Sequence, residues 1–131
     1  MRSGHPLTAH DQARPADLVE QEWYGVPLGY PFDSVRIAVE EATGRPVDVV
    51  QRLRDNRLIE ALVSESDRVA VLPRFTTPVE RVALRPVHGI PTARYIFAMS
   101  RPDRAERLAV RRVLDAFTAV AARAPTHSTV T

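Results

Sequence analysis

Residues 23–63 read WYGVPLGYPFDSVRIAVEEATGRPVDVVQRLRDNRLIEALV, and their pattern predicts strand, helix, strand and helix in turn. The β-prone run Trp23–Val26 comes first and stops at a proline. Asp33 is a plausible N-cap for a helix over Ser34–Thr43, which a following glycine ends. Val47–Leu53 then alternates as a strand does, with Val47, Val49, Gln51 and Leu53 on one face and Val50 on the other.

The second predicted helix begins at a cap, Asp55 or Asn56, and carries one apolar stripe made of Leu58, Ile59, Leu62 and Val63. A short apolar strand, Arg68–Pro73, follows it. Alternating strands and helices are typical of an α/β fold with parallel strands. Two later predicted strands, Arg81–Arg85 and Ala93–Ser100, add an antiparallel or crossover part, so a mixed sheet flanked by helices is expected.

The two ends of the chain read differently from each other. The first 17 residues are polar and contain prolines, which predicts an irregular segment. Near the other end, Asp103 and Glu106 form a capping-box pattern for a last helix. That helix repeats apolar residues with a helical period, namely Val110, Val113, Leu114, Phe117, Val120 and Ala121. Residues 125–131 are expected to form a flexible tail.

Composition narrows the class of protein. A chain of 131 residues with 44% hydrophobic and 26% charged residues is typical of one globular domain and not of disorder. It has no cysteine, which excludes disulfides, thiolate metal sites and a cysteine nucleophile. No apolar run approaches the roughly 18 residues that span a bilayer, and the N-terminus has no signal-peptide pattern. We therefore expect a cytoplasmic protein with no membrane partner.

Four stretches stand out when the chain is followed in order: Arg2–Leu7, Ala16–Leu18 with Glu22–Tyr24, Leu62–Val63 through Val69–Pro73, and Tyr95–Ser100 with the last helix. Together they resemble the C-terminal part of the effector-binding domain of LysR-type transcriptional regulators. The resemblance implies one lobe of a type 2 periplasmic-binding-protein-like fold within residues 1–124. Residues 5–90 would form the second lobe, and residues 91–124 a crossover strand and the C-terminal helix.

Two departures from the family pattern bear on this interpretation. Ser66 and Arg68 stand where the family usually has glycine, so a differently shaped turn is expected there. The family's DNA-binding domain, linker helix and first half of the effector domain have no counterpart in these 131 residues. The sequence leaves open whether the chain is a fragment, a truncated gene product or a single cloned lobe.

Catalytic and metal-binding motifs do not emerge from the sequence. The four histidines, His5, His10, His88 and His127, show no metal-ligand spacing. Glu40 and Glu41 are adjacent on a predicted helix and point about 100° apart, so they cannot converge on one substrate atom. No phosphate-binding glycine loop is present. We expect neither an enzyme nor a cofactor or metal site.

One loop is the candidate ligand site. It follows a predicted strand and opens a predicted helix, where ligands bind in open α/β sheets. The candidate residues are Gly29, Tyr30, Pro31, Phe32 and Ser34. Tyr30 and Phe32 either wall the ligand or anchor the loop on its own helix, and the sequence leaves both open. Arg52 is the candidate for pairing an anionic effector, with Arg54 and Arg57 nearby; surface pairing with Asp55 or Glu60 is the alternative.

The leading hypothesis is therefore an effector-sensing regulatory lobe that binds a small anionic metabolite in the intact regulator. A solute-binding protein of the same fold is one alternative, and a small enzyme is a more distant one. We expect weak effector binding, and DNA contact only through a domain outside this chain. We also expect a homo-oligomer, because the last helix and the helix face of Val35, Ala38, Val39 and Ala42 would lack their usual cover.

Overall fold

The structure is a computed structural model, and it describes residues 1–73, 76–90 and 97–123. The chain divides into two compact units, Met1–Thr92 and Ala93–Thr131. Within the described residues, no helix is long and apolar enough to cross a membrane.

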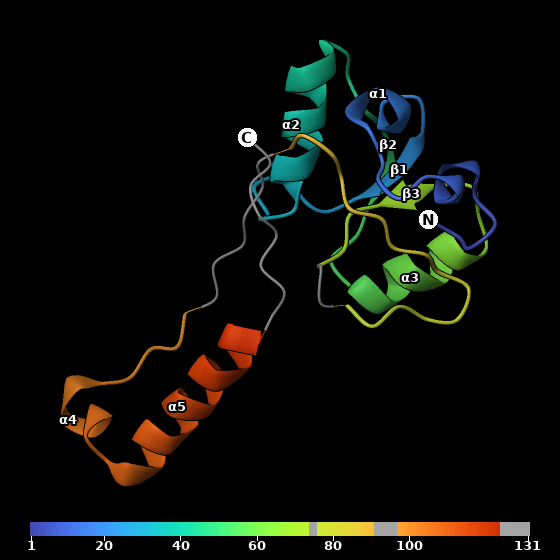
Figure 1. Cartoon of the computed structure of the whole chain (residues 1–131). Helices are drawn as coiled ribbons and strands as arrows, with labels where there is room; N and C mark the ends of the chain where they lie inside the picture. The colour runs from blue at the N-terminus through green and yellow to red at the C-terminus, as the bar shows by residue number, and fades with distance from the viewer. Residues whose placement is uncertain (74–75, 91–96, 124–131) are drawn as a thin grey trace. The chain divides into compact units, whose positions relative to one another are not determined.

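The first unit is built on a parallel sheet with strand order β2-β1-β3 (Figure 1). The strands are β1 (Glu22–Gly25), β2 (Asp48–Arg52) and β3 (Val69–Ala70). Helix α2 (Asp33–Thr43) connects β1 to β2, and α3 (Asn56–Ser64) connects β2 to β3. The α/β class with helices flanking a sheet is thereby confirmed. The named strands pair only in parallel, and an antiparallel component appears as one isolated bridge, Arg2 with Val82.

The two helices cover opposite faces of the sheet because successive side chains of β1 point to opposite sides. Trp23 packs in a cluster with Val39 of α2. Tyr24 packs in a second cluster with Ile59 and Val63 of α3, both of which are fully buried. Parallel strands with a helix on each face are the arrangement that positions functional loops at the carboxyl ends of the strands.

The structure of helix α2 differs from two predictions, which concern the role of Asp33 and the exposure of the apolar helix face. Phe32, not Asp33, occupies the N-cap, and no side chain caps this helix end. Asp33 is the first helical residue, and its carboxylate accepts hydrogen bonds from Arg36 and Arg52. It therefore does not accept hydrogen bonds from the free backbone N–H groups at the start of α2. Of the helix face expected to lack cover, Val35 and Val39 are buried within this unit, Ala38 is half-buried and Ala42 is exposed. The predicted C-terminus is confirmed, since Gly44 adopts φ +66° there.

Strand β2 carries a bulge that the alternating pattern concealed. Trp23 is opposite Val49, whereas Tyr24 is opposite Gln51, so Val50 is the extra residue. Val50 is exposed. Gln51 lies opposite Tyr24 and Val49 lies opposite Trp23, so the prediction that Gln51 and Val49 share one face is wrong. A bulge interrupts strict alternation, and the side chains after it no longer follow the count from before it.

The N-terminal segment is more ordered than predicted. It contains the 3-10 helix η1 (Pro6–Ala9) and the short helix α1 (Pro15–Leu18). His5 is buried, and its Nδ1 accepts a hydrogen bond from the Leu7 N–H at 3.1 Å, which caps η1. Proline at the first turn suits both helices because its fixed φ and missing N–H are tolerated there.

The predicted strand Arg81–Arg85 is wrong as a regular strand. This segment meets the N-terminal segment at an isolated bridge, Arg2 with Val82, and a second bridge, Ala13 with Val87, lies just beyond it. The Ser3 N–H donates to the Arg81 carbonyl and the Ala83 N–H to the Met1 carbonyl, but no continuous ladder forms. Pro86 has no N–H to extend a ladder between the two bridges. β3 is also shorter than the predicted Arg68–Pro73, because it pairs only with Trp23 and Tyr24 of β1. The predicted turn at His88 is present, with Gly89 at φ +70°.

The second unit contains α4 (Pro102–Ala105) and α5 (Leu108–Arg123). Of the predicted strand Ala93–Ser100, residues 93–96 lie outside the described residues, and residues 97–100 form no strand. The predicted capping box is wrong, because Glu106 closes α4 as its C-cap and α5 begins only at Leu108. The stripe of α5 has formed, and Val113, Phe117 and Val120 on it are more than half exposed.

Candidate functional site

The loop between β1 and α2 leaves the sheet at the carboxyl end of its central strand. Its backbone folds into two consecutive turns. The Tyr30 N–H donates to the Pro27 carbonyl at 3.2 Å, and the Asp33 N–H donates to the Tyr30 carbonyl at 2.9 Å. Gly29 supports the first turn at φ +79°, a backbone conformation that side chains other than glycine rarely adopt. The loop is therefore held in shape by its own hydrogen bonds.

The Ser34 hydroxyl adds a third local bond, because it donates to the Pro31 carbonyl at 2.7 Å. Ser34 is exposed, as are Gly29, Tyr30 and Pro31. Since a hydroxyl has one donor, the Ser34 proton serves the loop in this structure and its oxygen keeps acceptor capacity. The structure thus gathers the predicted loop residues on the surface at the start of α2.

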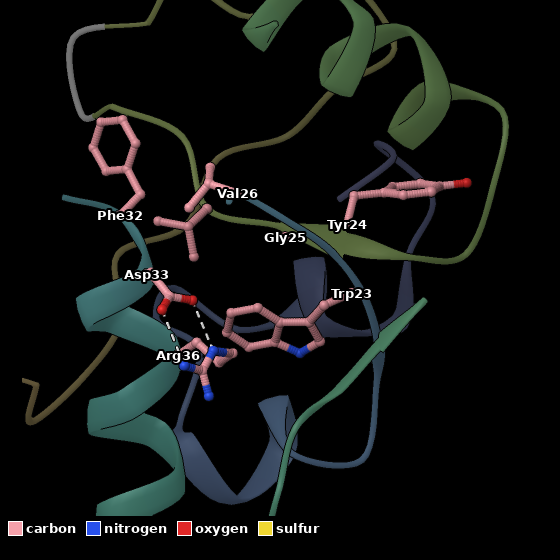
Figure 2. A pocket seen from close by; sticks show the side chains of 8 residues that line it. Trp23, Tyr24, Gly25, Val26, Phe32, Asp33 and Arg36 are labelled. Atoms are coloured by element: carbon pink, nitrogen blue, oxygen red, sulfur yellow. Dashed lines mark hydrogen bonds and ion pairs between the residues drawn. The ribbon is translucent and has the colours of Figure 1, made fainter. Parts of the chain in front are cut away.

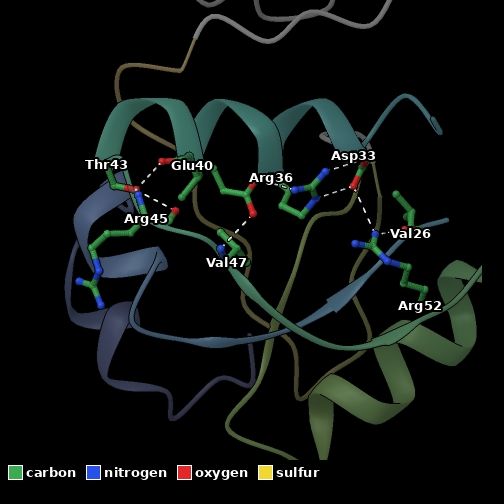
Figure 3. Close-up of polar contacts among 9 residues, drawn as sticks. Val26, Asp33, Arg36, Glu40, Thr43, Arg45, Val47 and Arg52 are labelled. Carbon is green, nitrogen blue, oxygen red and sulfur yellow. Dashed lines mark hydrogen bonds and ion pairs between the residues drawn. The ribbon is translucent and has the colours of Figure 1, made fainter. Parts of the chain in front are cut away.

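A network of charges ties this loop to both neighbouring elements (Figure 3). The Arg36 guanidinium donates to both carboxylate oxygens of Asp33, at 2.8 and 3.0 Å. Arg52 Nη1 donates to the Val26 carbonyl at 2.7 Å and to Asp33 Oδ1 at 3.4 Å. Val26 precedes the loop and Asp33 follows it, so one arginine from the end of β2 bridges both ends of the loop.

The same network continues along α2. Arg36 Nη1 donates to Glu40 Oε2 at 2.5 Å, and the Val47 N–H donates to Glu40 Oε1 at 3.0 Å. The hydrogen bonds from Arg36 hold the pKa of Asp33 below its ordinary value despite burial of the carboxyl. The Val47 N–H, followed by Arg36, lowers the pKa of Glu40 in the same way. Both carboxylates are thus charged near neutral pH and matched by arginines.

A small hollow lies beneath this network, and Figure 2 shows its lining. Its volume is about 10 Å³, which is room for about one water molecule. Phe32, Asp33 and Arg36 line it on the helix side, and Trp23 to Val26 with Val71 line it on the sheet side. Phe32 is half-buried and lines this hollow, so its position fits both predicted roles, ligand wall and loop anchor. The hollow is too small for a metabolite, so a ligand at this loop would have to lie on its open surface.

Three arginines were candidates for the anion contact, and their surroundings differ. Arg52 belongs to the network at the loop ends. Arg57 pairs with Glu60 at 3.3 Å, and the Glu60 side chain is almost fully buried. The Arg54 guanidinium lies over the Tyr30 ring, with its central carbon 5.8 Å from the ring centroid. Sequence reasoning named all three but chose Arg52, because local spacing does not show which arginine already has a carboxylate partner.

A second, open groove of about 340 Å³ is lined by Glu20, Gln21, Glu22, Asp67 and Arg68. Its charges are paired: Arg68 with Glu22 at 2.8 Å, Arg2 with Asp67, and Arg45 with Glu20. Across residues 1–73, 76–90 and 97–123, no three histidine, aspartate or glutamate side chains gather so as to hold a metal ion. The loop before α2 is therefore the better candidate site.

Comparison with known proteins gives one match. The model of the family described as the LysR substrate binding domain matches residues 1–122. No curated protein and no solved structure matches the chain. The family match covers most of the chain and includes the whole of the first unit and nearly all of α5.

Proposed function

Because the chain belongs to the family of LysR substrate binding domains, we propose that it senses a small anionic effector at the loop between β1 and α2. Domains of this family have a periplasmic-binding-protein-like fold and an effector-binding, regulatory role in LysR-type transcriptional regulators. The chemistry of the effector and the place where it binds are our proposal.

The observation that carries the proposal is the prearranged loop with an uncompensated positive charge beside it. Loop hydrogen bonds and the bridging Arg52 hold Tyr30 and Ser34 in place before any ligand arrives. Binding then costs little ordering entropy. Asp33 and Glu40 are matched by Arg36 and Arg52, so the charge of Arg54 favours an anion. The proposed site comprises Gly29, Tyr30, Pro31, Phe32, Ser34 and Arg52.

The experiment is a titration of the ¹⁵N-labelled 131-residue chain with benzoate, followed by amide chemical shifts. Benzamide, which has the same shape without the charge, is the matched control ligand. We expect benzoate to move the amides of Gly29, Tyr30 and Ser34, and benzamide to leave them unchanged. The site is an open surface, so we expect a dissociation constant of the order of 1 mM. Equal shifts with both ligands, or shifts confined to other residues, would contradict the proposal.

A further inference from the structure

We infer that Arg54, whose guanidinium lies over the Tyr30 ring, is the group that binds the carboxylate of the effector, and that Arg52 is a positioning residue for the loop. This inference rests on the proposed function and assigns the roles within it. It also narrows the ligand class to small molecules with a planar carboxylate next to an apolar or aromatic group. The assignment reverses the choice of arginine made from the sequence.

The three arginines near the site differ in whether a carboxylate of the chain already pairs with them. Arg52 donates from Nη1 to the Val26 carbonyl and to Asp33, and Arg57 pairs with the buried Glu60. Within the part of the chain that the structure describes, no carboxylate lies within ion-pair distance of Arg54. An effector at Arg52 or Arg57 would meet a positive charge that a carboxylate of the chain already offsets, whereas the charge of Arg54 has no such partner among the described residues.

The neighbouring aspartate does not cancel the charge of Arg54. Asp55 is the N-cap of α3, and its Oδ1 accepts the Arg57 N–H at 2.7 Å and the Leu58 N–H at 3.3 Å. A carboxylate engaged in a cap points toward the helix backbone. The cap therefore holds the Asp55 carboxylate on α3, and the Arg54 guanidinium lies over Tyr30.

The contact with Tyr30 uses none of the hydrogen-bond donors of Arg54. The guanidinium carbon lies over the Tyr30 ring, 5.8 Å from its centroid, which is within cation–π range. A guanidinium is planar, and its five N–H groups all lie in the plane and point outward. A planar carboxylate can then accept two parallel hydrogen bonds from the edge. Tyr30 is 41% exposed, which leaves apolar ring surface for the rest of the ligand.

Arg52 acts on this pair through the loop. It bridges the Val26 carbonyl and Asp33, the residues on either side of residues 27–32, and Tyr30 lies within that span. If the bridge is lost, the loop ends separate more readily and the Tyr30 ring no longer supports Arg54 in one place. Arg52 thus influences binding without contact to the ligand.

The test compares benzoate titrations of the full chain and of single variants. Arg54→Gln is expected to weaken binding about tenfold or more, because one charge-assisted, bidentate contact is lost. Arg54→Lys keeps the charge but not the planar fork, so its affinity should fall between those of the wild type and Arg54→Gln. Arg81→Gln, which removes an exposed ion pair with Glu65, is the matched control and should bind as the wild type does.

Amide hydrogen exchange distinguishes the positioning role of Arg52 from the ligand contact of Arg54. Arg52→Gln should weaken benzoate binding and also speed exchange of the Tyr30 and Asp33 amides, which close the two loop turns. Arg54→Gln should leave those exchange rates unchanged, and the Ile59 amide in α3 serves as an internal reference in both variants.

The outcomes test the role of Arg54, the role of Arg52 and the proposed site separately. Wild-type affinity in Arg54→Gln overturns the assignment, and if benzoate still shifts the loop amides the proposed function survives that failure. Unchanged exchange in Arg52→Gln overturns the positioning role. If benzoate produces no loop shifts in the wild-type chain, the proposed site and the inference built on it both fall.

Discussion

Replacing Asp33 with alanine tests the charge network on which the candidate site rests. The Asp33 side chain is only 5% exposed, and it accepts three hydrogen bonds, two from Arg36 and one from Arg52. Alanine leaves Arg36, itself only 16% exposed, with Glu40 as its remaining carboxylate partner. The change thus leaves a mostly buried arginine with one carboxylate partner in place of two.

Removing one partner of a buried ion pair costs about 3–5 kcal/mol of unfolding free energy. Arg36 keeps its pair with Glu40, and Arg52 is one-third exposed and can be rehydrated, so the loss lies at the lower end of that range. We therefore expect Asp33→Ala to lower the unfolding free energy by about 3 kcal/mol. Asp33→Asn keeps the shape and one acceptor oxygen, so about 1–2 kcal/mol is expected.

The effect should depend on pH in a defined direction. The pKa of Asp33 is lower in the folded chain than in the unfolded chain, chiefly because of the hydrogen bonds from Arg36. The folded state therefore binds fewer protons, and the contribution of Asp33 is complete above the unfolded pKa of about 3.9. It is lost as the pH falls through the folded value. The difference between wild type and Asp33→Asn should shrink below about pH 4.

Urea unfolding followed by tryptophan fluorescence is the assay, because the single tryptophan, Trp23, is 2% exposed and packs against α2. Glu20→Ala, which removes an exposed ion pair with Arg45, is the control and should leave the midpoint unchanged. A midpoint for Asp33→Ala equal to that of the wild type at pH 7 would refute the reasoning. So would a difference that stays constant from pH 7 to pH 3.

Four further results are expected. Ile59→Ala should cost about 3 kcal/mol in urea unfolding because Ile59 is fully buried, whereas its half-exposed neighbour Leu58→Ala should cost under about 1 kcal/mol; equal losses would contradict the packing of α3. Gly44→Ala should cost about 1 kcal/mol through backbone strain alone, since an added Cβ meets nothing within 4 Å at φ +66°; no loss of stability would show that this turn relaxes. The chain should self-associate weakly through the exposed apolar stripe of α5. In sedimentation experiments Phe117→Asp should associate less than the wild type, and Arg112→Glu should associate as the wild type does. A wild-type chain that stays monomeric at high concentration would argue against this. In a gel-shift assay the 131-residue chain alone should show no sequence-specific DNA binding, given its net charge of +2; a salt-resistant specific complex would disprove this.

Several elements were predictable because their signals are local. The α/β order follows from helical and strand periodicity within residues 23–63, and the α3 N-terminus follows from Asp55, which accepts two backbone N–H bonds as a cap does. Gly44 ends α2 because a left-handed residue closes a helix by its own conformation. In each case the deciding atoms lie within a few residues of one another along the chain.

Three of the failures involve a partner far away in sequence. Asp33 looks like a cap, but its carboxylate accepts hydrogen bonds from Arg36 and also from Arg52, nineteen residues later. The alternation of Val47–Leu53 hides a bulge because a bulge is a property of two strands, and β1 supplies the other one. Residues 81–85 have the pattern of a strand, but a strand needs a partner that continues beside it, and the backbone of the N-terminal segment pairs with residues 81–83 around a single bridge, Arg2 with Val82.

For the candidate site, its position was predictable from the sequence and the roles of its arginines were not. Its position at the end of β1 followed from the order of elements, since a loop that joins a parallel strand to its crossover helix lies at the carboxyl edge of the sheet. The roles of its arginines did not follow, because Arg52, Arg54 and Arg57 have the same chemistry and nearly the same place in the chain. Glu60 pairs with Arg57 from three residues away on the same helix, whereas only tertiary structure brings Asp33 to Arg52 and the Tyr30 ring to Arg54. Local sequence sets backbone preferences, whereas the free energy of a charge depends on which groups surround it after folding.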